Sequence, residues 1–312
     1  MKFDSRIYVA GHRGMVGSAI ERNLRARGFN NIILRTHAQL PLDNFSLVER
    51  FFIEEKPDYV FLAAAKVGGI VANETKGADF IHDNLRIQTN VIDAAYRYGV
   101  KKLLFLGSSC IYPKFAQQPI TEDSLLTGAM EPTNLPYAIA KIAGKVMCDA
   151  YRKQFGFNAF TVMPSNVYGV GDNFDPENSH VVAGMMRRFH EAKLANLSKV
   201  SVWGSGKPKR ELIEANDLAD ACVFLMLNYD DGGMVNLGSS KEVSIRELAY
   251  IMADIVGFKG EIGFDSSRPD GTPRKIMNND KICKMGWSAS TEISDGLSRM
   301  YNWWIENSKS NT

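Results

Sequence analysis

The sequence predicts an α/β fold: a doubly wound parallel sheet with a smaller, interleaved C-terminal region. Two observations lead to this prediction. Apolar, strand-like runs alternate with amphipathic, helix-like runs through the first half of the chain, an order typical of a parallel sheet with helices on both faces. The first strand also runs directly into a glycine-rich turn and a helix, which is the unit that opens many such sheets.

The elements of the first half follow one another closely. We expect strands at 6–10, 31–35, 59–63, from 102 and at 160–163, and helices at 18–27, 45–55, 80–98 and 137–155. A later strand at 234–237 is expected to return to this sheet, so that the two domains interleave. The first domain then comprises 1–168 with about 217–240, and the second comprises about 169–216 with 241–312, where a loop at 172–180, short helices and polar turns are expected.

The turn after the first strand is the strongest local motif. Because its glycines carry no side chains, the backbone of this turn can approach a dinucleotide pyrophosphate. The helix that follows offers N–H groups and the positive end of its dipole. This order of strand, turn and helix predicts a Rossmann-type dinucleotide site. The residues expected to hold the coenzyme there are Gly11, His12, Arg13, Gly14, Met15, Val16 and Gly17.

The end of the second strand indicates which dinucleotide binds. An NAD enzyme usually places an acid there to accept from the adenosine 2′-hydroxyl, whereas this strand ends in Arg35, Thr36 and His37. Together with Arg13, these residues make the local charge positive, which suits a 2′-phosphate. The sequence therefore predicts NADP(H).

Tyr137 and Lys141 are one helical turn apart and therefore share a helix face. A free phenol titrates at about pH 10, and a neighbouring ammonium favours its charged form. We expect Lys141 to lower the pKa of Tyr137, so that the phenol can exchange a proton with a carbonyl oxygen. Seen alone, the pair is more typical of an amphipathic helix with a snorkelling lysine, and the other motifs of the chain reverse that balance.

The strand that begins at Lys102 ends in small polar residues, among them Ser108 and Cys110. In an open parallel sheet, ligands bind outside the carboxyl ends of the strands. We therefore expect Ser108 and Cys110 to face the same crevice as the coenzyme.

Composition excludes several other classes. The chain has 312 residues, 45% hydrophobic and 23% charged, as in ordinary soluble proteins, and no apolar run is long enough for a membrane span. Four widely separated cysteines predict neither a metal site nor a disulfide framework, and a cytoplasmic location is expected. A net charge of +2 without a concentrated basic stripe gives no sign of nucleic-acid binding.

These motifs resemble the extended short-chain dehydrogenase/reductases, which act largely on nucleotide sugars. Longer strings, at 11–17, 63–70, 107–113, 131–141, 178–180 and 269–275, resemble the GDP-L-fucose synthase family along nearly the whole chain. The resemblance implies an NADPH-dependent enzyme that epimerises C3 and C5 of GDP-4-keto-6-deoxy-D-mannose and then reduces the C4 ketone. It also implies a homodimer formed through the helices at 80–98 and 137–155.

The same resemblance assigns further residues to the site. Coenzyme contacts would also come from Ala63, Ala64, Ala65, Leu106, Gly107, Lys141, Pro164, Ser165, Asn166, Val167 and His180. Substrate contacts would come from Arg188, Trp203, Arg210, Asp270 and Lys275. The catalytic group would be Ser108, Cys110, Tyr137, Lys141 and His180.

The chemistry fits these residues. C3 and C5 flank the ketone, so inverting them requires one group to remove a proton and another to return it from the opposite face. Cys110 and His180 are the candidates, because both residue types exchange protons around neutral pH. Tyr137 and Ser108 would donate to the developing enolate oxygen.

Departures from the family pattern leave alternatives open. Glu214, Ala215, Asn216 and Asn278 replace residues usual in the family, and they favour GDP-L-colitose synthase, which inverts only C5 of a 3-deoxy substrate, as the second candidate. A 4,6-dehydratase would need an acidic pair where this chain has Ser109 and Cys110. A 4-epimerase does not need the Cys110 and His180 pair, and a non-catalytic NADP sensor has no use for the catalytic group.

Overall fold

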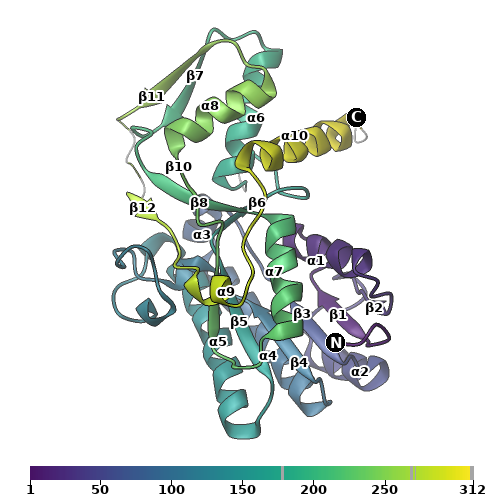
Figure 1. Ribbon diagram of the computed structural model, residues 1–312. Helices are drawn as coiled ribbons and strands as arrows, with labels where there is room; N and C mark the ends of the chain where they lie inside the picture. The colour runs from purple at the N-terminus through teal and green to yellow at the C-terminus, as the bar shows by residue number, and fades with distance from the viewer. Residues whose placement is uncertain (177–178, 268–269, 271, 310–312) are drawn as a thin grey trace.

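The computed structural model describes residues 1–312 except 177–178, 268–269, 271 and 310–312. Three residues of the family-like strings, Asn178, Pro269 and Gly271, lie outside the described residues. The molecule has a lower part built on one large sheet and an upper part with smaller sheets and three longer helices (Figure 1).

The large sheet has six parallel strands in the spatial order β2-β1-β3-β4-β5-β9. Its strands are β1 (Ile7–Ala10), β2 (Ile32–Ile33), β3 (Tyr59–Leu62), β4 (Lys102–Leu106), β5 (Ala159–Pro164) and β9 (Met234–Leu237). From β1 the chain first builds β2 on one side and then β3 on the other, so the strand order reverses between β1 and β3. A crevice for ligands is expected at this switch point.

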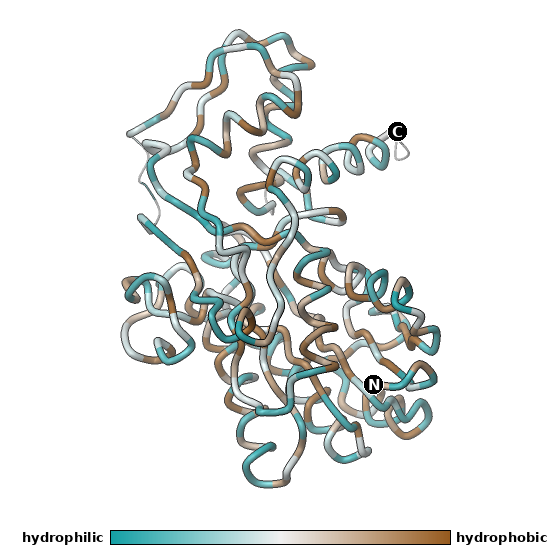
Figure 2. Tube along the Cα trace, in the orientation of Figure 1, coloured by the Kyte–Doolittle hydropathy of each residue, from teal (hydrophilic) through white to brown (hydrophobic). Residues whose placement is uncertain are grey.

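Helices cover both faces of the large sheet. They are α1 (Met15–Ala26), α2 (Phe45–Glu55), α4 (Gly77–Arg97), α5 (Leu135–Phe155), α7 (Ala215–Asn228) and α9 (Asp280–Lys284). The connections contain the short helix α3 (Ile70–Thr75), which lies against α4, and the 3₁₀ turns η1 (Ser109–Ile111), η2 (Glu122–Ser124) and η3 (Pro132–Asn134). Ile7 and Val9 pack with α1 and α7, whereas Tyr8 and Ala10 pack with α2, α4 and α5. Because both faces are buried, the strands are mostly apolar, and β1 (Ile-Tyr-Val-Ala) is buried at every position. Figure 2 shows the brown of hydrophobic residues along much of the inside of this lower part.

The upper part has its own core. Its elements are β6 (Asn166–Tyr168), α6 (Val181–Leu194), β7 (Lys199–Trp203), β8 (Lys209–Glu214), β10 (Glu242–Ser244), α8 (Ile245–Val256), β11 (Glu261–Asp265), β12 (Arg274–Lys275) and α10 (Ile293–Lys309). Strand β8 pairs with β6, β10 and β12, and β7 pairs with β11. Phe189 and Met186 of α6 pack with Leu248 of α8 and Leu297 of α10.

Most elements of the first half lie where the sequence predicts them. The second strand is shorter than expected, 32–33 instead of 31–35, and the first helix begins at Met15 rather than Ser18. The strand expected at 234–237 joins the large sheet beside β5, as predicted. The short helix α3 was not predicted.

The expectation of short helices in the second part holds for α9, which has 5 residues, but not for three other helices. Helices α6, α8 and α10 have 14, 12 and 17 residues. Helix α8 carries a capping box, in which Ser244 accepts from the Glu247 backbone and the Glu247 side chain accepts from the Ser244 backbone. Within the described ranges, no helix is both long and apolar enough to span a membrane, and no cluster of three or more His, Cys, Asp or Glu side chains suits a metal ion.

Candidate active site

A cleft of about 1590 Å³ opens where the large sheet meets the upper part. Residues following β1, β3, β4 and β5 line it from below, and α6, β7 and β8 contribute from above. Every catalytic and coenzyme residue predicted from the sequence lines this cleft, as do Arg188, Trp203, Arg210 and Asp270. Lys275 is not among the described lining residues, although it is the register partner of Arg210 across β12 and β8.

The glycine turn fits a dinucleotide pyrophosphate. Gly11 has a φ of +86°, and a Cβ there would lie 2.7 Å from the Ala64 nitrogen. A Cβ on Gly17 would lie 2.1 Å from the Gly11 oxygen, so neither position admits a side chain. Gly14 precedes α1 and supplies no side-chain cap, which leaves the helix start available to an anion.

Two buried polar atoms support the same fit. Ser165 Oγ and Asn134 Oδ1 belong to residues that line the cleft, and neither has a hydrogen-bond partner among the described residues. Buried polar groups normally find partners, so these two atoms indicate that a polar ligand binds here. The residues present therefore suit a bound dinucleotide and its polar substituents.

The positive residues predicted for the 2′-phosphate do not contribute equally. Arg13 and His37 are exposed on the cleft. The Arg35 guanidinium instead forms an ion pair with Glu55, donates to the Leu34 oxygen at 2.8 Å and lies over the Phe51 ring. Glu55 also pairs with Arg6 at 2.7 Å, so these three side chains keep one net positive charge, but the Arg35 guanidinium is held against Glu55 whereas Arg13 is exposed on the cleft.

Tyr137 and Lys141 lie on α5 at the floor of the cleft. Lys141 is only 3% exposed and donates from Nζ to the Leu106 oxygen at 2.8 Å. The same Nζ lies 4.8 Å from the centre of the Phe105 ring and 5.9 Å from that of Tyr137. Desolvation by burial lowers the pKa of Lys141 to about 7.

The predicted effect of Lys141 on the phenol is wrong in direction. Burial raises the pKa of Tyr137, the nearby Cys110 raises it further, and a hydrogen bond from Ser108 opposes both. The Lys141 Nζ lies over the ring but bonds to the Leu106 oxygen, and desolvation of the phenol is the largest cause of the shift. Tyr137 therefore stays protonated at neutral pH and acts as a donor.

Cys110 and His180 come from different parts of the chain. Cys110 lies in η1 and donates its backbone N–H to Ser108 Oγ at 3.2 Å. His180 precedes α6, with its backbone oxygen accepting from Gly184 N at 2.9 Å and its imidazole open to the cleft. Desolvation by burial lowers the pKa of His180, which favours the neutral imidazole.

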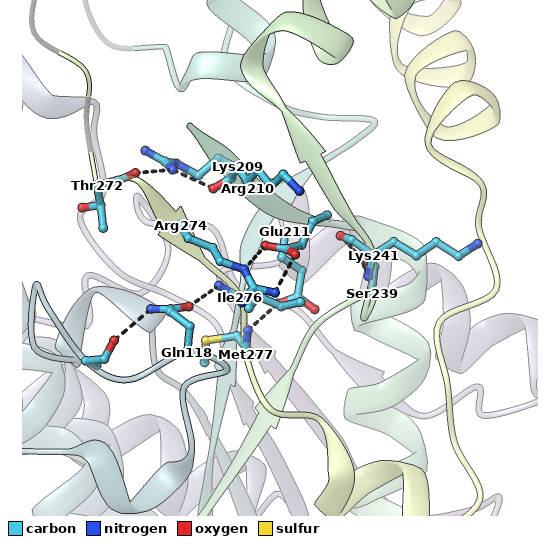
Figure 3. Close-up of polar contacts among 12 residues, drawn as sticks. Gln118, Lys209, Arg210, Glu211, Ser239, Lys241, Thr272, Arg274, Ile276 and Met277 are labelled. Carbon is cyan, nitrogen blue, oxygen red and sulfur yellow. Dashed lines mark hydrogen bonds and ion pairs between the residues drawn. The ribbon is translucent and has the colours of Figure 1, made fainter. Parts of the chain in front are cut away.

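The candidate substrate residues line the upper wall. The Arg188 guanidinium lies 5.7 Å from the centre of the Trp203 ring, and Asp270 accepts from Ser205 N and Oγ at 2.8 and 2.7 Å. Arg210 donates to the Thr272 oxygen at 2.6 Å. Figure 3 shows Arg210 reaching Thr272 while its neighbour Glu211 reaches Met277.

Glu211 holds three segments together behind this wall. Its side chain is 1% exposed and accepts from Ser240 N at 2.7 Å, Met277 N at 2.8 Å and Asn279 Nδ2 at 3.0 Å. Burial raises the pKa of Glu211, while the three donors oppose that rise. The strand that carries Arg210 is thereby fixed to the segment that follows β12.

The departures from the family pattern lie behind the cleft. Glu214 is buried and caps α7 by accepting from Asn216 N at 2.7 Å. Asn278 donates to Asp280 at 3.3 Å. Neither these three residues nor Ala215 is among the described residues that line the cleft.

Sequence reasoning missed several lining residues. Asp43 lines the end of the cleft near Arg35 and His37, and no local motif marks it. Lys66 also lines the cleft, with Nζ 2.7 Å from Asp83, a lining residue from α4. The string at 63–70 drew attention to Lys66 but gave no sign of its partner.

Comparison with known proteins places the chain in a family. Residues 7–238 match the NAD dependent epimerase/dehydratase family. The chain is 60% identical to "Putative GDP-L-fucose synthase 2" of Arabidopsis thaliana, covering 97% of this chain and 92% of that protein. It is 49% identical to GDP-L-fucose synthase of Escherichia coli strain K12, with 97% of each chain covered, and 33% identical to GDP-L-colitose synthase of Yersinia pseudotuberculosis.

Solved structures agree with this placement. A GDP-L-fucose synthetase from Naegleria fowleri bound to NADP superposes with a TM-score of 0.91 at 27% identity, covering 99% of this chain and 97% of that chain. MlghC, a GDP-mannoheptose C4 reductase from Campylobacter jejuni with NADP bound, has the same TM-score at 40% identity and covers 98% and 99%. The chain therefore belongs to the NAD dependent epimerase/dehydratase family, in the branch whose members are named GDP-L-fucose synthase.

Proposed function

We propose that this protein converts GDP-4-keto-6-deoxy-D-mannose to GDP-L-fucose, by epimerisation at C3 and C5 followed by NADPH-dependent reduction of the C4 ketone. One observation carries the proposal. A single cleft combines Tyr137, Lys141 and Ser108 beside a dinucleotide turn with two proton-exchanging side chains, Cys110 and His180, from separate elements. The 60% identity to a relative named as a GDP-L-fucose synthase supports the same function.

Cys110 and His180 are assigned to the two inversions. The C3 and C5 protons are acidic because the C4 ketone stabilises the carbanion as an enolate. Inversion follows when one residue removes the proton and the other returns one to the opposite face. The lowered pKa of His180 favours the neutral imidazole, which can accept a proton.

Tyr137 and Ser108 are assigned to the ketone oxygen. The raised pKa of Tyr137 keeps the phenol protonated, so it can donate a hydrogen bond as negative charge develops on the oxygen. Ser108 lies within hydrogen-bond reach of the phenol, and its one hydroxyl hydrogen can turn to the same ketone oxygen when a substrate is bound. Two donors held in place before the reaction stabilise the enolate without reorganisation.

The reduction uses the same residues. When bound, NADPH supplies the hydride that reduces C4. Tyr137 gives its proton to the C4 oxygen and becomes a phenolate, whose negative charge a protonated Lys141 would balance; Lys141 would also hold the nicotinamide ribose. Arg13 and His37, exposed on the cleft, would contact the adenosine 2′-phosphate, and the uncapped start of α1 would hold the pyrophosphate.

GDP-L-colitose synthesis is the less favoured reading. In the sequence, this alternative is favoured by four departures from the family pattern, at Glu214, Ala215, Asn216 and Asn278. None of these is a described lining residue of the cleft. The relative named GDP-L-colitose synthase is 33% identical, against 49% to 60% for the two GDP-L-fucose synthases compared above.

Product identification tests the proposal. The enzyme is incubated with NADPH and either GDP-4-keto-6-deoxy-D-mannose or its 3-deoxy analogue, and the products are identified by NMR. We expect GDP-L-fucose and a higher kcat/KM for the 3-hydroxy substrate, because a site built to bind a hydroxyl strongly rejects an analogue without it. A higher kcat/KM for the 3-deoxy analogue would favour colitose synthesis.

We further propose the domain division expected from the sequence, a homodimer and a cytoplasmic location. Residues 1–168 with about 217–240 would bind the coenzyme, and about 169–216 with 241–312 the GDP-sugar. Ile139 and Val146 on α5 are 38% and 48% exposed, which suits dimerisation through α4 and α5. Sedimentation of the wild type and of Val146→Glu tests the dimer.

The cysteines support the cytoplasmic location, because all four are free thiols, as expected in a reducing compartment.

A further inference from the structure

We propose that a ring contact between Phe174 and Trp304 positions His180 for the epimerisation steps; this inference rests on the proposed function. Phe174 lies in the loop between β6 and α6, and Trp304 lies on α10. Their rings are parallel within 3°, with centroids 4.4 Å apart. The C-terminal helix thereby holds the loop that carries His180.

Trp304 is itself fixed by its neighbours. The His190 ring of α6 meets it edge-on, with centroids 4.9 Å apart and planes at 74°. His190 Nδ1 in turn lies 2.9 Å from the Tyr301 hydroxyl. Helices α6 and α10 are therefore joined around the indole, and Phe174 stacks on a surface that is already rigid.

Hydrogen bonds hold the described loop residues near Phe174 and just before His180. Arg187 on α6 donates to the Phe174 oxygen at 3.0 Å and forms an ion pair with Glu191 at 2.9 Å. Asp175 N donates to Asn173 Oδ1 at 2.9 Å, and Ser179 N donates to the Asp175 oxygen at 3.0 Å. His180 follows directly and begins α6. The loop is thus held at its start by the stacked rings and at its end by the helix.

The contact is separate from the cleft. Phe174, Trp304 and Tyr301 are not among the described lining residues, whereas Ser179 and His180 are. Removing the ring contact therefore takes no group away from coenzyme or substrate. It acts on the loop, whose described cleft-lining residues are Pro176, Ser179 and His180, and of these only His180 is assigned to proton transfer. Because acid–base catalysis depends on hydrogen-bond reach, such a change affects inversion more than hydride transfer.

Amide exchange tests the contact without any turnover. Trp304→Ala and Phe174→Leu should speed hydrogen exchange in peptides covering 173–184 by about tenfold or more, and leave peptides of α1 unchanged. Trp303→Ala is the matched control, since Trp303 precedes Trp304 on the same helix. Phe174→Leu leaves α10 intact, so it decides the matter if Trp304→Ala fails to fold. Unchanged exchange in both variants would overturn the proposal.

Separate half-reactions test the role. Inversion is followed as uptake of solvent deuterium, and reduction is followed as NADPH oxidation with a ketone already inverted at C3 and C5. We expect Trp304→Ala to slow inversion by roughly tenfold to a hundredfold while reduction and the NADPH Kd stay within about twofold. Trp304→Phe, which keeps a ring, should restore most of the inversion rate. Equal losses in both half-reactions would contradict a role through His180.

A double-mutant cycle shows whether Trp304 acts through His180. In a His180→Asn background, Trp304→Ala should cause no further loss of inversion, because the positioned group is already gone. Additive losses would overturn the inference. If the wild-type protein inverts neither carbon, the proposed function fails, and the amide exchange of 173–184 still decides whether Trp304 holds the loop.

Discussion

The Lys141 Nζ lies 5.9 Å from the centre of the Tyr137 ring and donates to the Leu106 oxygen at 2.8 Å. The lysine thus lies beneath the phenol and is anchored to the end of β4. Burial lowers the pKa of Lys141 to about 7 and raises that of Tyr137. Two groups with opposite shifts share one α5 face, which is typical of a site that moves protons.

The Lys141 shift predicts a pH-dependent stability. Between about pH 7 and pH 10.5 the folded lysine has lost its proton while the unfolded lysine keeps it. Unfolding then takes up a proton, so Lys141 makes the free energy of unfolding rise with pH in this window. Lys141→Met should remove that rise and abolish reduction. Urea unfolding of both proteins between pH 6.5 and 9.5 measures this, and parallel pH curves would contradict the buried, shifted lysine.

Cys110 and His180 should separate inversion from reduction. Cys110→Ser should stop inversion but leave hydride transfer, so that the product becomes a 6-deoxyhexose of the D series. His180→Asn should slow epimerisation by about 10²-fold to 10⁴-fold, a loss typical of general acid–base catalysis. Cys222→Ser, at a buried cysteine far from the cleft lining, is the control. Wild-type formation of the L sugar by Cys110→Ser would refute the assignment.

The coenzyme site should prefer NADPH over NADH. One charge-assisted phosphate contact contributes about 1.5 to 3 kcal/mol, which corresponds to a preference of roughly tenfold to a hundredfold. Arg13→Ala should reduce this preference more than Arg35→Ala, because Glu55 already pairs with Arg35. Michaelis constants for both coenzymes measure the effect. Equal Michaelis constants for NADPH and NADH in the wild type, or a larger loss of NADPH preference in Arg35→Ala than in Arg13→Ala, would contradict this distribution of charge.

Glu211 should be important for stability. Glu211→Ala leaves three donors buried without their acceptor, and each such group costs about 1 to 3 kcal/mol. We expect a clear drop in Tm and weaker GDP binding, because the strand carrying Arg210 loses its tie to the segment after β12. Glu242→Gln, which breaks a surface pair with Arg274, should change Tm little. Similar Tm values for both variants would exclude this role.

The parts predicted well from the sequence depend on local patterns. The turn with Gly11 and Gly17 and the α5 face with Tyr137 and Lys141 are fixed by residues at most a few positions apart. Relationships across the chain were not predictable in this way. Strand β7 pairs with β11 about sixty residues later, and the Arg35 charge depends on Glu55, twenty residues away.

The pKa of Tyr137 shows the same limit of sequence-based prediction. Spacing alone places Lys141 near Tyr137 and suggests a lowered pKa. Whether charge or desolvation dominates depends on how deeply both side chains are buried, which is set by strands and helices distant in sequence. Lys275, placed in the site by resemblance, likewise proves to be the strand neighbour of Arg210 and not a described cleft residue.

Isotope placement tests the central claim most directly. The enzyme turns over GDP-4-keto-6-deoxy-D-mannose with NADPH in deuterated water, and NMR locates deuterium in the product. If one cleft performs both inversions and the reduction, solvent deuterium appears at C3 and C5 of GDP-L-fucose, and the C4 hydrogen comes from NADPH. Deuterium at C5 alone, or at neither carbon with a D-series product, would contradict the account.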